Sequence, residues 1–298
     1  MREVCFIPRD AGFFSVFNFY IGSLCSGLNA YPYFNKEELL SRYGKNEHFA
    51  YWTENDNCWF DYFDPVKFFD DDTNHEEKYK SFPRINGENI ADVHFRIPSK
   101  IKSLFLSEDK FKEFRENTHK IYSKVISFRK DIIDSIDTSH WISDNVIGVH
   151  YRHPSHFIES GAIKLDSYFE AIDKILEKYP QSKIFIASDN NFGIYAFKER
   201  YGEALFYLAD VDRITMSEFL EWAFNLAQHT ADSVGFMNGK GFELHHKRVN
   251  NTNNKKMTQD LFREVLCLSK CNQMVHTISN VSLAISYMNP NLELITLV

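Results

Sequence analysis

The chain has 298 residues, enough for two modest α/β domains or one large one, and 44% of the residues are hydrophobic, enough to form real cores. Its formal net charge is −7, from 34 basic and 41 acidic residues, so the basic surface of a general nucleic-acid-binding protein is not expected. This charge balance still allows a small anionic ligand, because one well-placed arginine can bind it.

The first four residues resemble no signal peptide, and no apolar run has the length of a membrane span. We therefore expect a cytoplasmic protein. The five cysteines are scattered and odd in number, so we expect them to be reduced. Cys267 and Cys271 would lie one helical turn apart, with His276 after them, but no second pair supplies further ligands. We interpret the two cysteines as core packing and predict no metal site.

The first half begins with a short apolar run, predicted to be a strand over 4–7, followed by a turn and an apolar helix over 13–28. Strand, turn and helix in this order start a Rossmann-like layer. The segment 31–85 is rich in aromatic residues, which either pack a core, the interpretation we favour, or line a sugar-binding cleft. The Asp70–Asp72 run superficially resembles an Asp-x-Asp metal motif, and we favour a solvated acidic loop. Amphipathic helices are predicted over 108–127 and 128–138.

The second half alternates more clearly between strands and helices, which predicts a parallel sheet covered on both faces. A basic, loop-like segment interrupts it over 235–256. The domain boundary is predicted between residues 143 and 144, giving domains 1–143 and 144–298. The strands are expected over 146–151, 184–187, 204–208, 274–277 and 292–297, and the helices over 165–179, 192–201, 217–229, 258–271 and 281–288.

Polar residues follow three of the predicted strands, where ligands of open parallel sheets bind. Arg152 can hold phosphate oxygens with its planar fork and keeps its charge. Together these strand ends predict a nucleoside diphosphate site, although Asp189 and Asn190 could simply turn the chain and Ser279 could only cap a helix. The residues are His150, Arg152 and His153 at the end of the first strand, Ser188, Asp189 and Asn190 at the end of the second, and Thr277, Ser279 and Asn280 at the end of the third.

Three segments carry a resemblance to a known family. Ile-Gly-Val-His-Tyr-Arg-His at 147–153 resembles the His-x-Arg motif of fucosyltransferases, nearest to the α-1,6-fucosyltransferases that include the Nod-factor enzymes, with protein O-fucosyltransferases as relatives. Ala-Ser-Asp-Asn at 187–190 and Thr-Ile-Ser-Asn at 277–280 are similar to later motifs of the same family. The resemblance covers residues 146–290, and the turn at 9–13 is similar to the Gly-rich first turn of such enzymes.

The resemblance implies a GT-B fold, an α/β architecture in which two Rossmann-like domains have parallel sheets facing a central cleft. It also implies inverting transfer from GDP-fucose without a metal or another cofactor. His153, Glu264 and Asn280 depart from the residues that the family often has, which leaves another sugar open. The implied donor-binding residues are His150, Arg152, Asp189, Asn190, Glu264, Thr277, Ser279 and Asn280.

Inverting transfer needs charge stabilisation on the leaving diphosphate and a base for the acceptor hydroxyl. We assign the first role to Arg152 and the second to Glu159, with His153 and His156 as alternative bases. Asp10 and Gly12 are expected to contact the acceptor. These residues complete the predicted catalytic and acceptor sites.

The sequence therefore predicts a glycosyltransferase that moves fucose from GDP-fucose to a glycan in surface polysaccharide or glycolipid synthesis. Two alternatives stay open: a GT-B transferase that uses another nucleotide sugar, and a catalytically inactive protein that binds a nucleotide or a glycan. The expected partners are the nucleotide sugar and the glycan acceptor, without nucleic acid. A lipid-linked acceptor would bring the chain to the inner face of a bacterial membrane.

Overall fold

A computed structural model describes residues 2–9, 11–43, 53–66, 80–86, 98–141, 145–152, 163–218, 220 and 254–298. The chain folds into two compact units. The sequence predicts one boundary between residues 143 and 144, whereas the observed division also assigns two later segments to the first unit. Unit 1 comprises Met1–Ile136, Asn253–Arg263 and Asn280–Asn291, and unit 2 comprises Asp137–Thr252, Glu264–Ser279 and Leu292–Val298.

Unit 1 contains a three-stranded parallel sheet in the order β2-β1-β3, with β1 over Arg2–Phe6, β2 over Leu28–Pro32 and β3 over Arg84–Ile85. The predicted helix after β1 is present as α1, but it ends at Cys25. Gly27 adopts a φ of 81°, the left-handed backbone that commonly ends a helix. The sequence analysis missed β2 because it extended the helix through this glycine.

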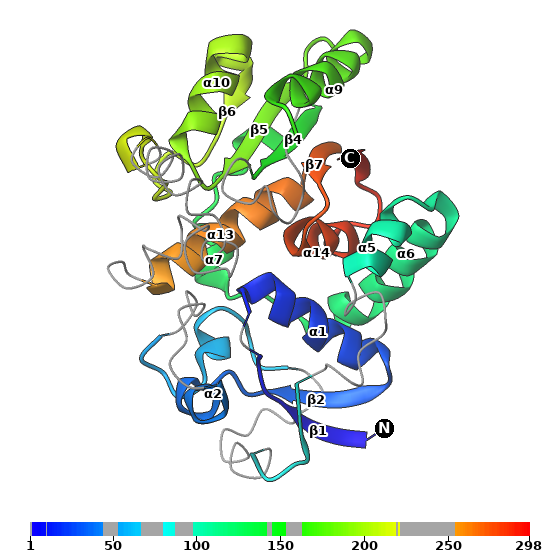
Figure 1. Ribbon diagram of the computed structural model, residues 1–298, viewed down its shortest axis with the longest axis vertical. Coiled ribbons are helices and arrows are strands. Elements are labelled where there is room, and N and C mark those ends of the chain that lie inside the picture. Colours follow the sequence, from blue (N-terminus) through cyan, green and yellow to red (C-terminus); the bar gives the residue numbers. More distant parts are fainter. Residues whose placement is uncertain are drawn as a thin grey trace, which may run out of the picture. The chain divides into compact units, whose positions relative to one another are not determined.

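The remaining elements of unit 1 are mostly helical, and the two helices predicted after residue 107 are present, each shorter than expected. The last helix of the unit, α14, contacts both α1 and α6. Figure 1 shows α5 and α6 side by side in turquoise. The elements are α1 (Phe13–Cys25), α2 (Lys36–Tyr43), η1 (Cys58–Asp61), α5 (Pro98–Phe105), α6 (Glu108–Val125), α7 (Lys130–Asp134) and α14 (Asn280–Met288).

Aromatic side chains build the core of unit 1. The rings of Trp59 and Phe63 stack with centroids 4.2 Å apart, and Phe13 meets Phe262 edge-on at 4.7 Å. Trp59, Tyr62 and Phe63 are at most 1% exposed, so for these three the packing interpretation of the aromatic segment is confirmed. Trp52, Phe68, Phe69 and Asp70–Asp72 lie outside the described residues.

Unit 2 is built on a five-stranded, all-parallel sheet in the order β6-β5-β4-β7-β8. All five predicted strands are present, with ends that differ by a few residues. The helix α13 is shared, because the division between the units falls within it. The elements are β4 (Val146–Tyr151), α9 (Leu165–Lys178), β5 (Lys183–Ser188), α10 (Asn191–Tyr201), β6 (Leu205–Phe206), α13 (Asn254–Ser269), β7 (Gln273–Thr277) and β8 (Glu293–Leu297), together with the short η3 (Ser139–Trp141) and η4 (Gly202–Ala204).

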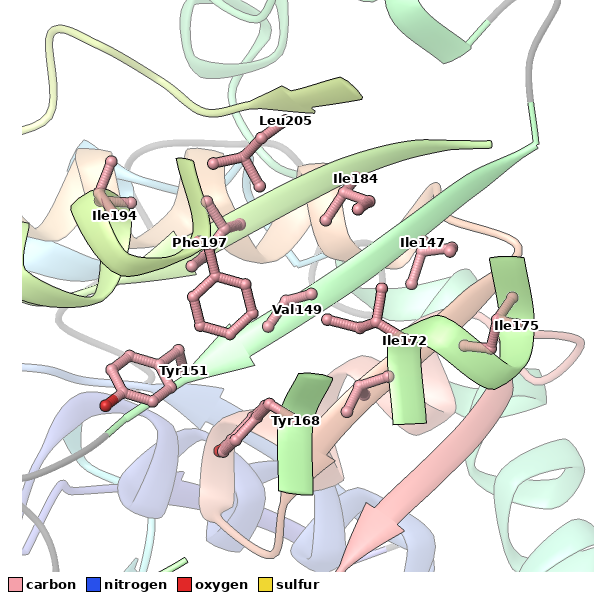
Figure 2. Packing of buried hydrophobic residues seen from close by; sticks show 12 residues of the cluster. Ile147, Val149, Tyr151, Tyr168, Ile172, Ile175, Ile184, Ile194, Phe197 and Leu205 are labelled. Atoms are coloured by element: carbon pink, nitrogen blue, oxygen red, sulfur yellow. The ribbon is translucent and has the colours of Figure 1, made fainter. Parts of the chain in front are cut away.

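The two faces of β4 are packed by different elements. Ile147, Val149 and Tyr151 alternate along the strand and pack with apolar residues of α9 and α10, as Figure 2 shows. On the other face, a Cβ added at Gly148 would lie 3.0 Å from both Cys271 Sγ and Leu268 Cδ2. The predicted packing role of Cys267 and Cys271 is confirmed, because both are buried and Cys271 Sγ lies 3.4 Å from the Cys267 carbonyl oxygen.

Two negative observations apply to the described part of the chain alone. No helix there combines the length and the apolar character that a bilayer crossing requires. In the same residues, no group of three or more His, Cys, Asp or Glu side chains is placed to hold a metal ion.

Candidate nucleotide site

The order of the strands in unit 2 locates a candidate ligand site. Within the sheet, β5 and β6 follow β4 on one side of that strand, and the chain then crosses to place β7 and β8 on its other side. Ligands of open parallel sheets bind beyond the carboxyl ends of the strands where this direction reverses. That position is the adjacent ends of β4 and β7, which the chain reaches at Tyr151 and Thr277.

His150 lies at this edge with an unsatisfied ring nitrogen. Its side chain is 9% exposed, and its Nδ1 atom has no hydrogen-bond partner among the described residues. Burial, and then the positive charge of Arg152 and the neighbouring His276, lower the pKa of His150 to about 3. The imidazole is therefore neutral near pH 7, with one nitrogen able to donate and the other able to accept. A buried nitrogen without a hydrogen-bond partner destabilises the folded state unless a ligand or a water molecule binds to it.

Arg152 follows the end of β4 and is half-buried. Its charge is among the causes of the lowered His150 pKa, so its guanidinium field reaches the buried imidazole. A guanidinium keeps its proton under all ordinary conditions and can bind two phosphate oxygens at once. The end of β4 therefore presents a fixed positive charge beside a neutral hydrogen-bonding ring.

The end of β7 contributes hydroxyl groups and a fully engaged histidine. His276 is 0% exposed, its Nδ1 donates to the Thr277 carbonyl at 2.9 Å, and its Nε2 accepts from the Thr296 hydroxyl at 3.2 Å. Thr277 is buried, and burial raises the pKa of the neighbouring Tyr168 phenol to about 12. Ser279 is half-buried directly before α14, where a side chain commonly caps a helix.

At the end of β5, the side chain of Asn190 caps the helix that follows, α10. Its Oδ1 accepts from the Gly193 N–H at 2.8 Å, which caps α10, and its Nδ2 donates to Asp189 Oδ1 at 2.8 Å. Asp189 is half-buried. The close approach of this turn to β4 requires glycine, because a Cβ at Gly193 would lie 2.4 Å from the Tyr151 ring. Asn190 therefore caps α10, and the Asp189 carboxylate accepts a hydrogen bond from the Asn190 side chain.

Glu264 on α13 forms a buried ion pair with Arg213. Arg213 is 4% exposed and also donates from Nε to the Ser188 carbonyl at 3.0 Å. Sequence analysis missed Arg213, because a single arginine in an irregular segment has no periodicity or motif.

The other predicted site residues are placed as follows. Asn280 begins α14 and belongs to unit 1, where its carbonyl and its Oδ1 accept from Asn18 Nδ2 at 3.0 and 3.2 Å. Gly12 is exposed directly before α1, and its carbonyl accepts the first hydrogen bond of the helix from Ser15 N at 3.0 Å. Asp10, His153, His156 and Glu159 lie outside the described residues.

The strand order and the all-parallel pairing define unit 2 as a Rossmann-like α/β domain. No protein-family model matches the chain, and no curated protein matches its sequence. In structure, the chain is similar to the NodZ α-1,6-fucosyltransferase soaked with GDP-fucose, with a TM-score of 0.50 and 14% identity over 98% of this chain and 93% of that chain. The predicted α/β GT-B fold is thereby confirmed.

Two further NodZ structures have lower scores. The enzyme co-crystallized with GDP has a TM-score of 0.46 at 13% identity, over 97% of this chain and 92% of that one. The structure of NodZ from Bradyrhizobium has a TM-score of 0.45 at 14% identity, over 92% of this chain and 89% of that one. At these identities the likeness concerns the fold, and the activity is argued separately below.

Proposed function

We propose that the chain is an inverting, metal-independent glycosyltransferase that moves fucose from GDP-fucose to a glycan acceptor. The observation that carries this proposal is the buried, unsatisfied His150 nitrogen beside Arg152, at the point where the strand order of unit 2 reverses. The similarity in fold to a fucosyltransferase whose crystals were soaked with GDP-fucose supports the choice of donor.

The donor diphosphate occupies the ends of β4 and β7 in this proposal. Arg152 binds phosphate oxygens and stabilises the negative charge that develops on the leaving diphosphate. The neutral His150 ring donates one hydrogen bond, and the Thr277 and Ser279 hydroxyls supply others. Because these protein groups balance the charge of the leaving group, we propose that transfer proceeds without a metal ion.

The nucleoside half of the donor extends toward the end of β5. The Asp189 carboxylate can accept hydrogen bonds from ribose hydroxyls or from N–H groups of a base edge. Glu264 is assigned to the same half of the site, and its pairing with Arg213 fixes its position. Asn190 and Asn280 are also proposed to contact the donor, in addition to the hydrogen bonds that they make at the starts of α10 and α14.

The acceptor hydroxyl needs a base, and we propose Glu159 for this role with His153 as the alternative. Asp10 and Gly12 are proposed to contact the acceptor. We further propose that the acceptor belongs to surface polysaccharide or glycolipid synthesis, with the chain in the cytoplasm and at the membrane when the acceptor is lipid-linked. Cell fractionation checks the location, and recovery outside the cytoplasm and its membrane would refute it.

Thermal shift against GDP, UDP and CMP tests the proposal. A ligand at a hundredfold excess over its dissociation constant stabilises the folded state by about 2.7 kcal/mol. We expect this stabilisation from GDP, in the presence of EDTA as well as without it, and its loss in Arg152→Ala. Arg200→Ala is the matched control, because Arg200 is an exposed arginine of the same unit that pairs with Asp173.

The other results select between the alternatives. Stabilisation by UDP or CMP and not by GDP would indicate another nucleotide sugar and would refute GDP-fucose as the donor. No response to any nucleotide, together with binding of glycans, would indicate a glycan-binding protein without transferase activity. Loss of the GDP effect on addition of EDTA would refute metal independence.

A further inference from the structure

Residues 208–214 form a bracket beside the end of β5. Ile214 N donates to the Asp189 carbonyl, and Asn191 N donates to the Ile214 carbonyl, each at 2.9 Å. The two bonds make an isolated parallel bridge between Asn190 and Ile214. The bracket therefore holds the backbone on both sides of Asn190, immediately beyond the strand that delivers Asp189.

Arg213 fastens this bracket to the strand and to α13. Its Nε donates to the Ser188 carbonyl at 3.0 Å, and its Nη2 donates to Glu264. Its Nη1 donates to the carbonyls of Leu208 and Val211 at 2.8 and 3.3 Å. One guanidinium thus joins the end of β5, the bracket itself and the carboxylate on α13.

A gain in folding stability does not explain well why the Arg213–Glu264 ion pair is buried. Both side chains of the Arg213–Glu264 pair are nearly inaccessible, at 2% and 10% exposed. Removing two charges from water has a large penalty, and well-packed apolar residues often stabilise a protein as well as a buried ion pair does. Apolar residues could not hold three backbone carbonyls and a carboxylate in fixed positions. The arrangement is therefore better explained by the geometry that it imposes on the end of β5.

We propose that Arg213 is a positioning residue for the nucleoside half of the donor. Paired with Glu264, it fixes the Ser188–Asp189 backbone so that the half-buried Asp189 carboxylate meets the hydroxyl or N–H groups of a nucleoside. This inference rests on the proposed function, because it assumes that a nucleoside diphosphate binds at these strand ends. Arg213 acts through Asp189 and Glu264, whereas the diphosphate is bound by groups on β4 and β7.

Titration calorimetry with GDP and with inorganic pyrophosphate separates the two halves of the site. For Arg213→Met we expect the dissociation constant of GDP to rise by about tenfold or more, the effect of losing a well-placed hydrogen bond to a charged group. The dissociation constant of pyrophosphate should stay within about twofold of the unmodified protein, because β4 and β7 are unchanged. Asp189→Asn should show the same GDP-selective loss. Arg200→Met, an exposed arginine of the same unit, should change neither value.

A parallel loss of both ligands in Arg213→Met would overturn the proposal, because it would indicate general damage to the unit. Unchanged GDP binding would overturn it as well. If Arg213→Met does not fold, the double variant Arg213→Met with Glu264→Leu removes the pair without leaving a buried charge, and it must show the same selective loss. Failure of the unmodified protein to bind GDP would instead refute the proposed function, so the two failures are distinguishable.

Discussion

His150 on β4 and His276 on β7 are register partners in adjacent strands, but they differ in the state of their ring nitrogens. His276 uses both nitrogens, on the Thr277 carbonyl and the Thr296 hydroxyl. Among the described residues, Nδ1 of His150 has no hydrogen-bond partner although it is buried. Packing and strand pairing alone would favour an apolar residue at position 150, so we interpret the exception as the mark of the ligand site.

The buried imidazole predicts a pH dependence of stability. The pKa of His150 falls from 6.5 to about 3 on folding, so between these values the unfolded chain binds a proton that the folded chain does not. Stability therefore rises with pH in this window and is lost as the pH falls from 6.5 toward 3, by up to about 1.4 kcal/mol per pH unit. Urea unfolding at pH 7, 6 and 5 should show a smaller pH slope for His150→Gln than for the unmodified chain. Equal slopes would contradict the lowered pKa.

The turn at Gly193 predicts a steric penalty for alanine. A Cβ there would lie 2.4 and 2.7 Å from two atoms of the Tyr151 ring, which is 1% exposed and held by the core of unit 2. Gly193→Ala should therefore lower the free energy of unfolding by about 1–3 kcal/mol, as overpacking does. Gly12→Ala is the control, because its added Cβ would meet nothing within 4 Å and its φ of −59° suits alanine. A loss for Gly193→Ala no larger than for the control would contradict the packing.

The contact between α1 and α14 predicts a coupled pair of substitutions. Asn18 is 0% exposed; it donates to Asn280 and accepts from the Tyr287 hydroxyl at 2.7 Å. Asn18→Leu leaves buried polar partners unsatisfied and should destabilise the chain by about 1–3 kcal/mol. Tyr287→Phe should cost about 1 kcal/mol in the unmodified chain and nothing in the Asn18→Leu background, where the hydroxyl has already lost this acceptor. Equal costs in both backgrounds, measured by urea unfolding, would refute the coupling.

The far end of α14 predicts a capping effect. Arg115 on α6 is 9% exposed and donates to the carbonyls of Ser286 and Asn289, each at 2.9 Å, where the helix leaves its last carbonyls without internal partners. Burial lowers the pKa of Arg115 to about 10, which keeps it charged near pH 7. Arg115→Met should cost about 1–3 kcal/mol of stability. Lys112→Met on the exposed side of α6 should be nearly neutral, and an equal loss in both variants would argue against the cap.

The elements that could be predicted from the sequence are those whose hydrophobic periodicity matches their burial in the fold. The buried strand before Arg152 and the amphipathic α9 follow from periodicity, and parallel pairing brings the strand ends together. The predicted helix extends beyond the observed end of α1, because the end of this helix depends on the left-handed backbone of Gly27. Arg213 could not be found, since its importance comes from contacts with Ser188 and Glu264, residues remote in sequence. The Gly193 bond shows that Asn190 caps α10, whereas its donor-binding role stays a prediction.

Release of GDP from GDP-fucose, followed with a glycan acceptor mixture and a metal chelator present, tests the central claim most directly. We predict release by the unmodified chain and by Arg200→Ala. For Arg152→Ala, which loses charge stabilisation on the leaving group, we predict that the rate falls by about 100-fold or more. Equal rates in the two arginine variants would contradict the account. So would release from a UDP-sugar and not from GDP-fucose, or GDP binding without any release.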